Sequence, residues 1–167
     1  MVQVTVARLG LDSSTNTYVV VLREREGPRV LPIWIGQPEA ESIAMELNHV
    51  KRERPMTHDL CRALITGLGG MLRKVTITRV HQSTFYAELQ LEGPAGGVVL
   101  DARPSDSIAI ALRLDAPIFV PELLLTEVME AEPLEPGEGA PRSELTAEQL
   151  KAYLEQLRPE DFGRFLP

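Results

Sequence analysis

The sequence predicts an α+β domain in which helices pack against a mixed, largely antiparallel sheet. Several short segments alternate apolar with polar residues or form β-branched runs, as strands do. Two other segments begin with proline and then carry apolar residues at helical spacing. Each of these helical segments follows a group of three strand-like segments.

Three strands are expected in the first part of the chain, over residues 2–6, 17–22 and 29–35, with a turn at 12–16. Pro32 has no N–H group, so the third strand should lie at a sheet edge or carry a bulge. A helix over residues 36–47 follows, with Pro38 in its first turn. Glu39 and Glu41 suit its positive end and are interpreted as solvated acids.

A second helix is expected after the basic loop at residues 51–55. Thr57 is a good N-cap for it, and Gly69-Gly70 would end it. Its predicted core face consists of Leu60, Ala63, Leu64 and Leu68. The only cysteine, Cys61, cannot pair within the chain and is interpreted as a small core residue.

The second half is expected to contain strands at 75–80, 85–91 and 98–101, then a helix at 103–112. A short strand at 117–120 and a helix at 122–130 follow. Ser42-Ile43-Ala44 in one helix matches Ser107-Ile108-Ala109 in the other. An internal β-β-β-α pseudo-repeat and a chance similarity both remain open, since three shared residues are weak evidence.

Three regions are expected: a domain at 1–130, a flexible acidic linker at 131–143 and a helical C-terminal appendage at 144–167. Residues 1–120 carry 13 basic and 13 acidic side chains, and residues 121–167 carry 4 and 11, so the net charge of −7 lies in the tail. A neutral domain is compatible with nucleic acid. The appendage, with apolar Leu150, Tyr153, Leu154 and Leu157, is expected to dock on its own domain or a second subunit.

The N-terminal residues alternate at once and lack the features of a signal peptide. No apolar stretch approaches the roughly 18 residues needed to cross a bilayer. We therefore expect a cytoplasmic protein that does not associate with membranes.

The most distinctive polar segment is residues 100–107, where a predicted strand gives way to a helix. Backbone N–H groups at a helix start bind anions, and Arg103 could grip a phosphate. Asp101 and Asp106 could hold a divalent metal such as magnesium. The structural alternative is that Ser105 caps the helix, Asp106 complements its dipole and Arg103 pairs with Asp101.

A basic cluster, Lys51, Arg52 and Arg54, lies in a loop followed by His58. These side chains are expected to contact a nucleic-acid backbone. Glu53 dilutes the charge and no aromatic residues interleave it, so a solvated loop is the alternative. No histidine spacing typical of metal sites, nucleophile elbow or phosphate-binding glycine loop occurs.

Three blocks of the sequence carry a family resemblance: residues 31–44 (LPIWIGQPEAESIA), 54–60 (RPMTHDL) and 101–112 (DARPSDSIAIAL). Together they resemble the signature blocks of the bifunctional nuclease (BFN) family, which is widespread in bacteria and also found in plants. The resemblance covers residues 1–130. It implies hydrolysis of DNA and RNA, a mixed sheet with packed helices, and a homodimer. It carries over no catalytic residues; the polar block positions here are Gln37, Glu39, Glu41, His58, Asp59, Asp101, Arg103, Ser105 and Asp106.

Two functions from different classes follow. The first is a metal-assisted nuclease with little sequence preference, in which Asp101 and Asp106 hold the metal and Arg103 holds the phosphate. Lys51, Arg52, Arg54 and His58 would contact the DNA or RNA. The second is a non-enzymatic, homo-oligomeric module that binds nucleic acid, a small anion or a protein partner.

Overall fold

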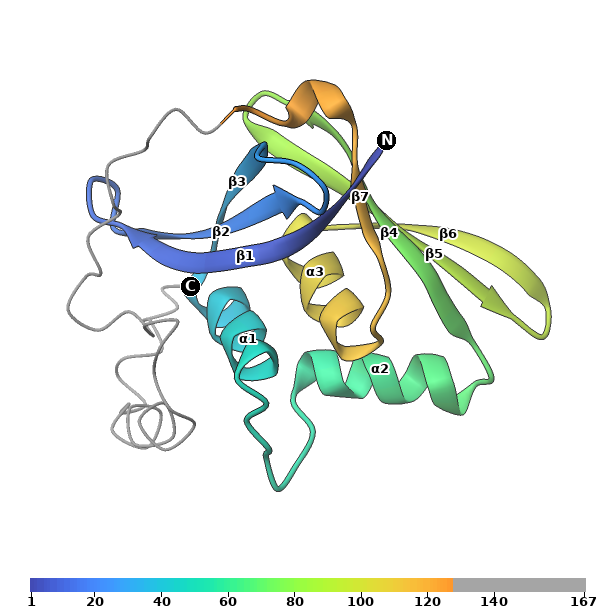
Figure 1. Ribbon diagram of the computed structural model, residues 1–167. Helices are drawn as coiled ribbons and strands as arrows, with labels where there is room; N and C mark the ends of the chain where they lie inside the picture. Colours follow the sequence, from blue (N-terminus) through green and yellow to red (C-terminus); the bar gives the residue numbers. More distant parts are fainter. Residues whose placement is uncertain (128–167) are drawn as a thin grey trace.

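The computed structural model describes residues 1–127 and confirms the α+β class (Figure 1). In this part of the chain seven strands form one sheet in the order β3-β2-β1-β7-β4-β5-β6. The strands are β1 (Val2–Asp12), β2 (Thr17–Glu24), β3 (Val30–Ile35), β4 (Met71–His81), β5 (Thr84–Gly93), β6 (Gly96–Ala102) and β7 (Ile118–Val120). The helices are α1 (Gln37–Leu47), α2 (Thr57–Gly67) and α3 (Pro104–Arg113), with a 3₁₀ turn η1 (Glu122–Leu124).

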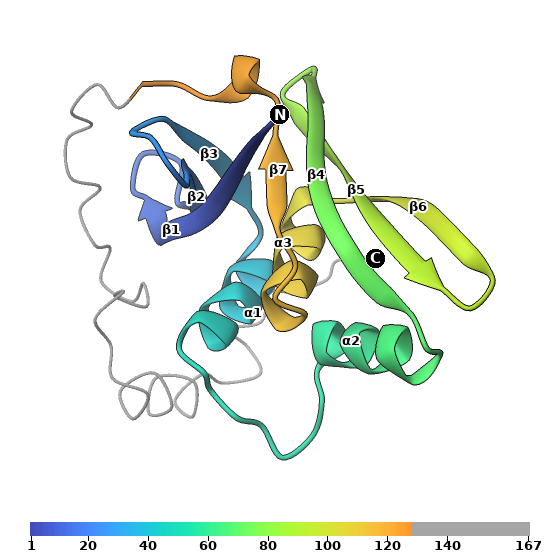
Figure 2. The ribbon, with the colours of Figure 1, turned by 45° about the vertical axis from the view of Figure 1, so that its right-hand side comes forward.

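The two halves share one topology, which supports the pseudo-repeat. β1-β2-β3 and β4-β5-β6 are antiparallel meanders, and each leads into a helix with proline in its first two positions. β7 joins the meanders because it pairs antiparallel with β1 and parallel with β4. Figure 2 shows α1 and α3 side by side against the sheet, with α2 added beside α3.

The core lies between α1, α3 and the sheet. Its fully buried side chains come from both halves of the repeat, for example Leu22 and Ile43 from the first and Ile77 and Ile108 from the second. Burial of each such side chain contributes about 1.5–3 kcal/mol. Pro32 lies on β3, an edge strand of the sheet, as its missing N–H predicted. This core fixes the positions at which α1 and α3 begin.

The predicted core face of α2 is wrong. Leu60, Ala63, Leu64 and Leu68 are all exposed, and it is Cys61 and Ile65 that pack against the core. The helix is turned this way because His58 and Asp59, in its first turn, make polar contacts to α3. Thr57 is the first helical residue rather than the cap, and the Met56 N–H donates to Asp59 Oδ2 at 2.9 Å.

The helix predicted over residues 122–130 is also wrong within the described residues. Only η1 forms, because Leu125 is extended and Thr126 pairs with Val30 at the edge of β3. Their two backbone hydrogen bonds are 2.8 and 2.9 Å long. The remainder of that prediction, the linker at 131–143 and the appendage at 144–167 lie outside the described residues. No helix within residues 1–127 is long and apolar enough to cross a membrane.

Candidate functional site

Polar side chains from the N-terminal halves of the three helices and from the residue before α3 form one connected network. Arg103, the residue before α3, donates to Asp106 Oδ2 at 2.8 Å and to Glu39 Oε1 of α1 at 2.7 Å. Asp106 Oδ1 lies 3.0 Å from His58 Nε2 of α2. His58 Nδ1 in turn lies 2.8 Å from Ser42 Oγ of α1. We call these five residues the carboxylate network.

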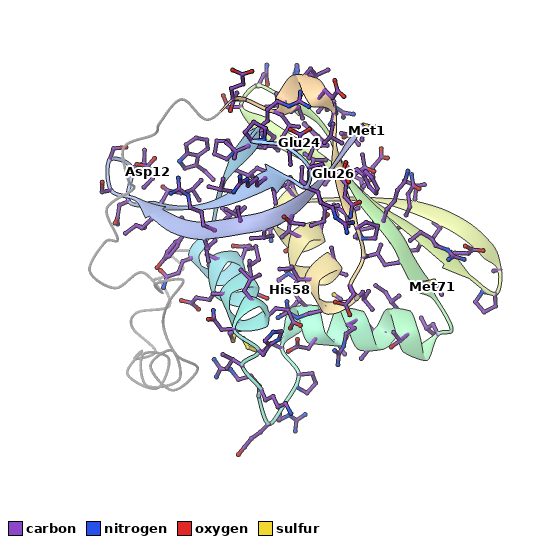
Figure 3. The ribbon with its side chains drawn as sticks, in the orientation of Figure 1. Met1, Asp12, Glu24, Glu26, His58 and Met71 are labelled. Atoms are coloured by element: carbon purple, nitrogen blue, oxygen red, sulfur yellow. The ribbon has the colours of Figure 1, made fainter. Side chains whose placement is uncertain are left out.

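His58 orients the network rather than offering a free base. Figure 3 shows it at the start of α2. Both of its ring nitrogens have partners, and its side chain is only 11% exposed. A neutral imidazole donates from one nitrogen and accepts at the other, so Ser42 can donate to it while it donates to Asp106. Ser42 itself is buried, so this serine–histidine–aspartate chain does not present an open nucleophile.

The electrostatics of the network favour a charged Asp106. Partial burial raises the pKa of Asp106, but the hydrogen bonds from Arg103 and His58 outweigh burial and leave the pKa below its ordinary value. The pKa of Arg103 is raised, chiefly by its bond to Asp106. The Arg103 side chain is 66% exposed, so part of its guanidinium remains accessible to a phosphate.

The structural alternative for residues 100–107 is corrected in two respects. Ser105 does not cap α3, since it is buried inside the helix and Arg103 occupies the cap position. Arg103 pairs with Asp106 and Glu39 instead of Asp101. The separate prediction that Glu39 is a solvated acid is also wrong, because its side chain is only 14% exposed and is paired with Arg103.

Asp101 lies away from the carboxylate network. It is exposed on β6 directly opposite Glu88 of β5. Directly opposed residues share one face of a sheet and neighbours along a strand alternate between faces. Ala87 and Ala102, the next opposed pair, pack against the core, so Asp101 points to the other face. Its role as a metal ligand stays a prediction.

The loop between α1 and α2 forms a basic hollow of about 490 Å³. Lys51, Arg52 and Arg54, the residues predicted to contact nucleic acid, line it together with Arg62. Its acidic lining residues are Glu46, Glu53 and Asp59. The structure therefore gathers the predicted cations around one concave surface and adds a fourth.

Arg113 is a buried arginine that contacts Asp59, a lining residue of the hollow. Its role was not predicted from the sequence. Arg113 Nε donates to Asp59 Oδ1 at 2.6 Å, and its other nitrogens donate to the carbonyls of Ala109 and Ser42 at 2.9 and 3.2 Å. Arg113 follows Asp106 by seven residues, so both lie on one side of α3. A charged residue on the side of α3 that also carries Asp106 was therefore the signal in the sequence that could have identified Arg113.

The first turn of α2 joins the basic hollow to the carboxylate network. His58 bonds to Asp106 in the network, and the next residue, Asp59, lines the hollow. Consecutive Cα atoms are about 3.8 Å apart. The hollow and the network therefore meet at the first turn of α2, and we treat them together as the candidate site.

Glu39 and Asp106 bring two carboxylates close together in the site. Arg103 bridges the carboxylates of Glu39 and Asp106, which are oxygen donors of the kind that magnesium prefers. Within residues 1–127 no group of three or more His, Cys, Asp or Glu side chains could hold a metal. One or two carboxylates suffice for magnesium, because water and substrate phosphate usually complete its shell.

The Asp59–Arg113 pair predicts a specific pH dependence of stability. Burial raises the pKa of Asp59, but its bonds from Arg113 and the Met56 backbone outweigh burial and lower the pKa overall. A lowered pKa adds stability above the unfolded value of about 3.9, and this stability is lost as pH falls through the folded value. The difference in unfolding free energy between wild type and Asp59→Asn should therefore have its largest value at pH 6 and become smaller below pH 4. Urea titrations at several pH values measure it, and a constant difference would contradict the assignment.

Comparison with known proteins identifies the family of this chain. The family model described as the bifunctional nuclease domain matches residues 20–132. An uncharacterized protein of Mycobacterium tuberculosis is 42% identical over 164 residues, covering 97% of this chain and 98% of that protein. Bifunctional nuclease 2 of Arabidopsis thaliana is 31% identical over 110 residues, which cover 63% of this chain. Bifunctional nuclease 1 of Oryza sativa subsp. indica is 28% identical over 116 residues, which cover 67% of this chain. The matches span 33% and 35% of these two plant proteins. The chain belongs to the bifunctional nuclease domain family.

Proposed function

We propose that this protein hydrolyses phosphodiester bonds of DNA and RNA with little sequence preference, assisted by a divalent metal. One observation carries the proposal: the first turn of α2 joins a basic hollow to two carboxylates and an exposed arginine. The names of the plant relatives, bifunctional nucleases, support the same reaction class. The similarity to an uncharacterized mycobacterial protein, which extends over nearly the whole chain, supports neither the presence nor the absence of activity.

The basic hollow would hold the nucleic-acid strand. Lys51, Arg52 and Arg54 provide positive charge for backbone phosphates, which are the same in every sequence. Among residues 1–127, no Phe, Tyr or Trp side chain lines the hollow, so it lacks the large rings on which bases usually stack. Little sequence preference and tolerance of both DNA and RNA follow from this composition.

The carboxylate network would act on the phosphate. Arg103 would turn from Glu39 and Asp106 to the phosphate oxygens, which offer a similar bidentate partner. The released carboxylates would then hold magnesium or a similar ion, with His58 keeping Asp106 in place. A bound divalent ion supplies Lewis acidity at the phosphoryl oxygen. Glu39 thus joins Asp106 as a proposed ligand.

The full chain should cleave single-stranded DNA, double-stranded DNA and RNA when magnesium or manganese is supplied. Excess chelator should lower the rate by about 10²-fold or more, because the carboxylates alone cannot polarise the phosphate. Gel assays with labelled substrates of mixed sequence measure both effects. Undiminished cleavage in chelator would remove the metal from the proposal.

A non-enzymatic binding module is the second candidate. It is favoured by the two occupied ring nitrogens of His58, which leave this imidazole in the carboxylate network unable to act as a free base. In the same assay this function would appear as retention of nucleic acid, weakened by salt, without cleavage under any supplied metal. That result would overturn the nuclease proposal.

We also propose a homodimer formed along β6. Within residues 1–127 this strand ends the order of strands and pairs only with β5 (Figure 1). Val98, Val99 and Leu100 are exposed in succession, so apolar side chains protrude from both faces of this edge strand. Such an edge readily pairs with an identical strand.

The dimer can be tested with one charged substitution. Val99→Lys should raise the dissociation constant about tenfold or more, because an edge lysine opposes strand pairing. Val80→Lys, on interior strand β4, is the matched control and should leave association unchanged. Sedimentation velocity over a range of concentrations measures both. A monomeric wild type would contradict the proposal.

A further inference from the structure

An apolar stripe runs along the exposed side of α2. Met56, Leu60, Leu64 and Leu68 follow at intervals of four residues and are 45%, 51%, 53% and 76% exposed. Side chains four residues apart share one side of a helix. Contiguous apolar surface of this kind usually marks a contact site. We call these four residues the α2 stripe.

The chain itself contains a segment with a complementary pattern. Residues 144–167 carry Leu150, Tyr153, Leu154 and Leu157 at the spacing of one helical face. This segment lies beyond the family match, which ends at residue 132. The mycobacterial relative nevertheless matches 97% of the chain, which must include most of it. The segment is therefore part of the protein that the two share.

The length of chain before this segment allows it to reach α2. The described residues end at 127, at the opposite end of the molecule from α2 (Figures 1 and 2). Sixteen residues, 128–143, separate that point from residue 144, and three of them are proline. An extended proline-rich chain of this length spans about 50 Å. A domain of this size is roughly 35 Å across.

Charge favours the same position. Residues 128–167 contain nine acidic and four basic side chains. The N-terminal end of α2 adjoins the basic hollow of Lys51, Arg52, Arg54 and Arg62. A segment lying on the stripe would bring its acidic residues close to these cations and gain attraction over distances within about 10 Å.

We propose that residues 144–167 dock on the α2 stripe of their own chain. Leu150, Leu154 and Leu157 would cover Leu60, Leu64 and Leu68, which the described residues leave exposed. The proposal does not depend on nuclease activity. The leucines of α2 that were predicted to face the core would instead be covered by this C-terminal segment.

Amine cross-linking tests this position in the full chain. The protein has three lysines: Lys51 lies in the loop before α2, and Lys151 lies within the proposed docking segment. Lys74 lies on β4 opposite Gln90, next to the core pair Val75 and Leu89, and so on the sheet face away from the helices. A short amine-reactive reagent should join Lys151 to Lys51 rather than to Lys74, as identified by mass spectrometry. Leu64→Glu or Leu154→Glu should lower the yield of these links about tenfold, because each places a charge in the apolar contact.

Matched variants and isotope mixing make the result decisive. Leu123→Glu changes an exposed leucine on η1, far from α2, and Gln156→Glu adds the same charge beside the apolar face of the segment. Both should retain the links. In a mixture of ¹⁴N and ¹⁵N protein the links should join peptides of one isotope only. Mixed-isotope links would show docking on a second copy and overturn the proposal, as would links insensitive to Leu64→Glu and Leu154→Glu.

Discussion

Replacing Arg113 with methionine is expected to lower the free energy of unfolding by about 3 kcal/mol. The Arg113 side chain is 3% exposed and binds Asp59 of α2 and the Ser42 carbonyl of α1 from its place on α3. Methionine fills similar volume but donates no hydrogen bond. Removal of one partner of a buried ion pair typically costs about 3–5 kcal/mol. We take the lower end because Asp59 is 29% exposed and regains some water.

Urea unfolding followed by circular dichroism measures this loss. Arg73→Met is the matched control, since Arg73 pairs with Glu92 and both side chains are more than half exposed. Exposed ion pairs contribute about 0–1 kcal/mol, so the control should remain near wild type. A loss for Arg113→Met no larger than for the control would show that Arg113 does not hold the three helices together.

Much of the sheet and the positions of all three helices could be predicted because their signals are local. Alternation gave the strands, and proline followed by helical spacing gave α1 and α3. The face of α2 could not be predicted in this way. Its leucines have the spacing of a core face, but the contacts of His58 and Asp59 with α3 decide the orientation. Those contacts join residues 48 and 54 positions apart.

In the candidate site, too, contacts between residues close in sequence could be predicted and contacts between distant residues could not. Arg103 and Asp106 were predicted together because they belong to one helix start, and their bond is local. Glu39 was misjudged because its partner, Arg103, is 64 positions away. Asp101 was grouped with Asp106 by proximity in sequence, while the pleat of β6 sends its side chain to the other face of the sheet. Sequence distance alone does not reveal which face a strand residue takes when the strand is about to end.

Asp106→Asn is expected to lower the rate of nucleic-acid cleavage by about 10²–10³-fold, the usual cost of removing one preorganised electrostatic group. Asp106 is the residue through which Arg103, His58 and the proposed metal all act. Asparagine keeps the shape and one oxygen acceptor but loses the charge that holds the cation. Cleavage rates under saturating magnesium, with the unfolding free energy measured in parallel, separate this effect from a loss of folded protein.

Asp101→Asn is the matched comparison, since it makes the same change on the opposite face of the sheet. If the carboxylate network is the reaction centre, Asp101→Asn should leave the rate within about threefold of wild type, as surface substitutions away from a site do. The reverse pattern, with Asp101→Asn inactive and Asp106→Asn active, would place the metal on the other face and refute the network as the site. Because both variants change one carboxylate to an amide, a difference in rate between them must come from where each side chain lies.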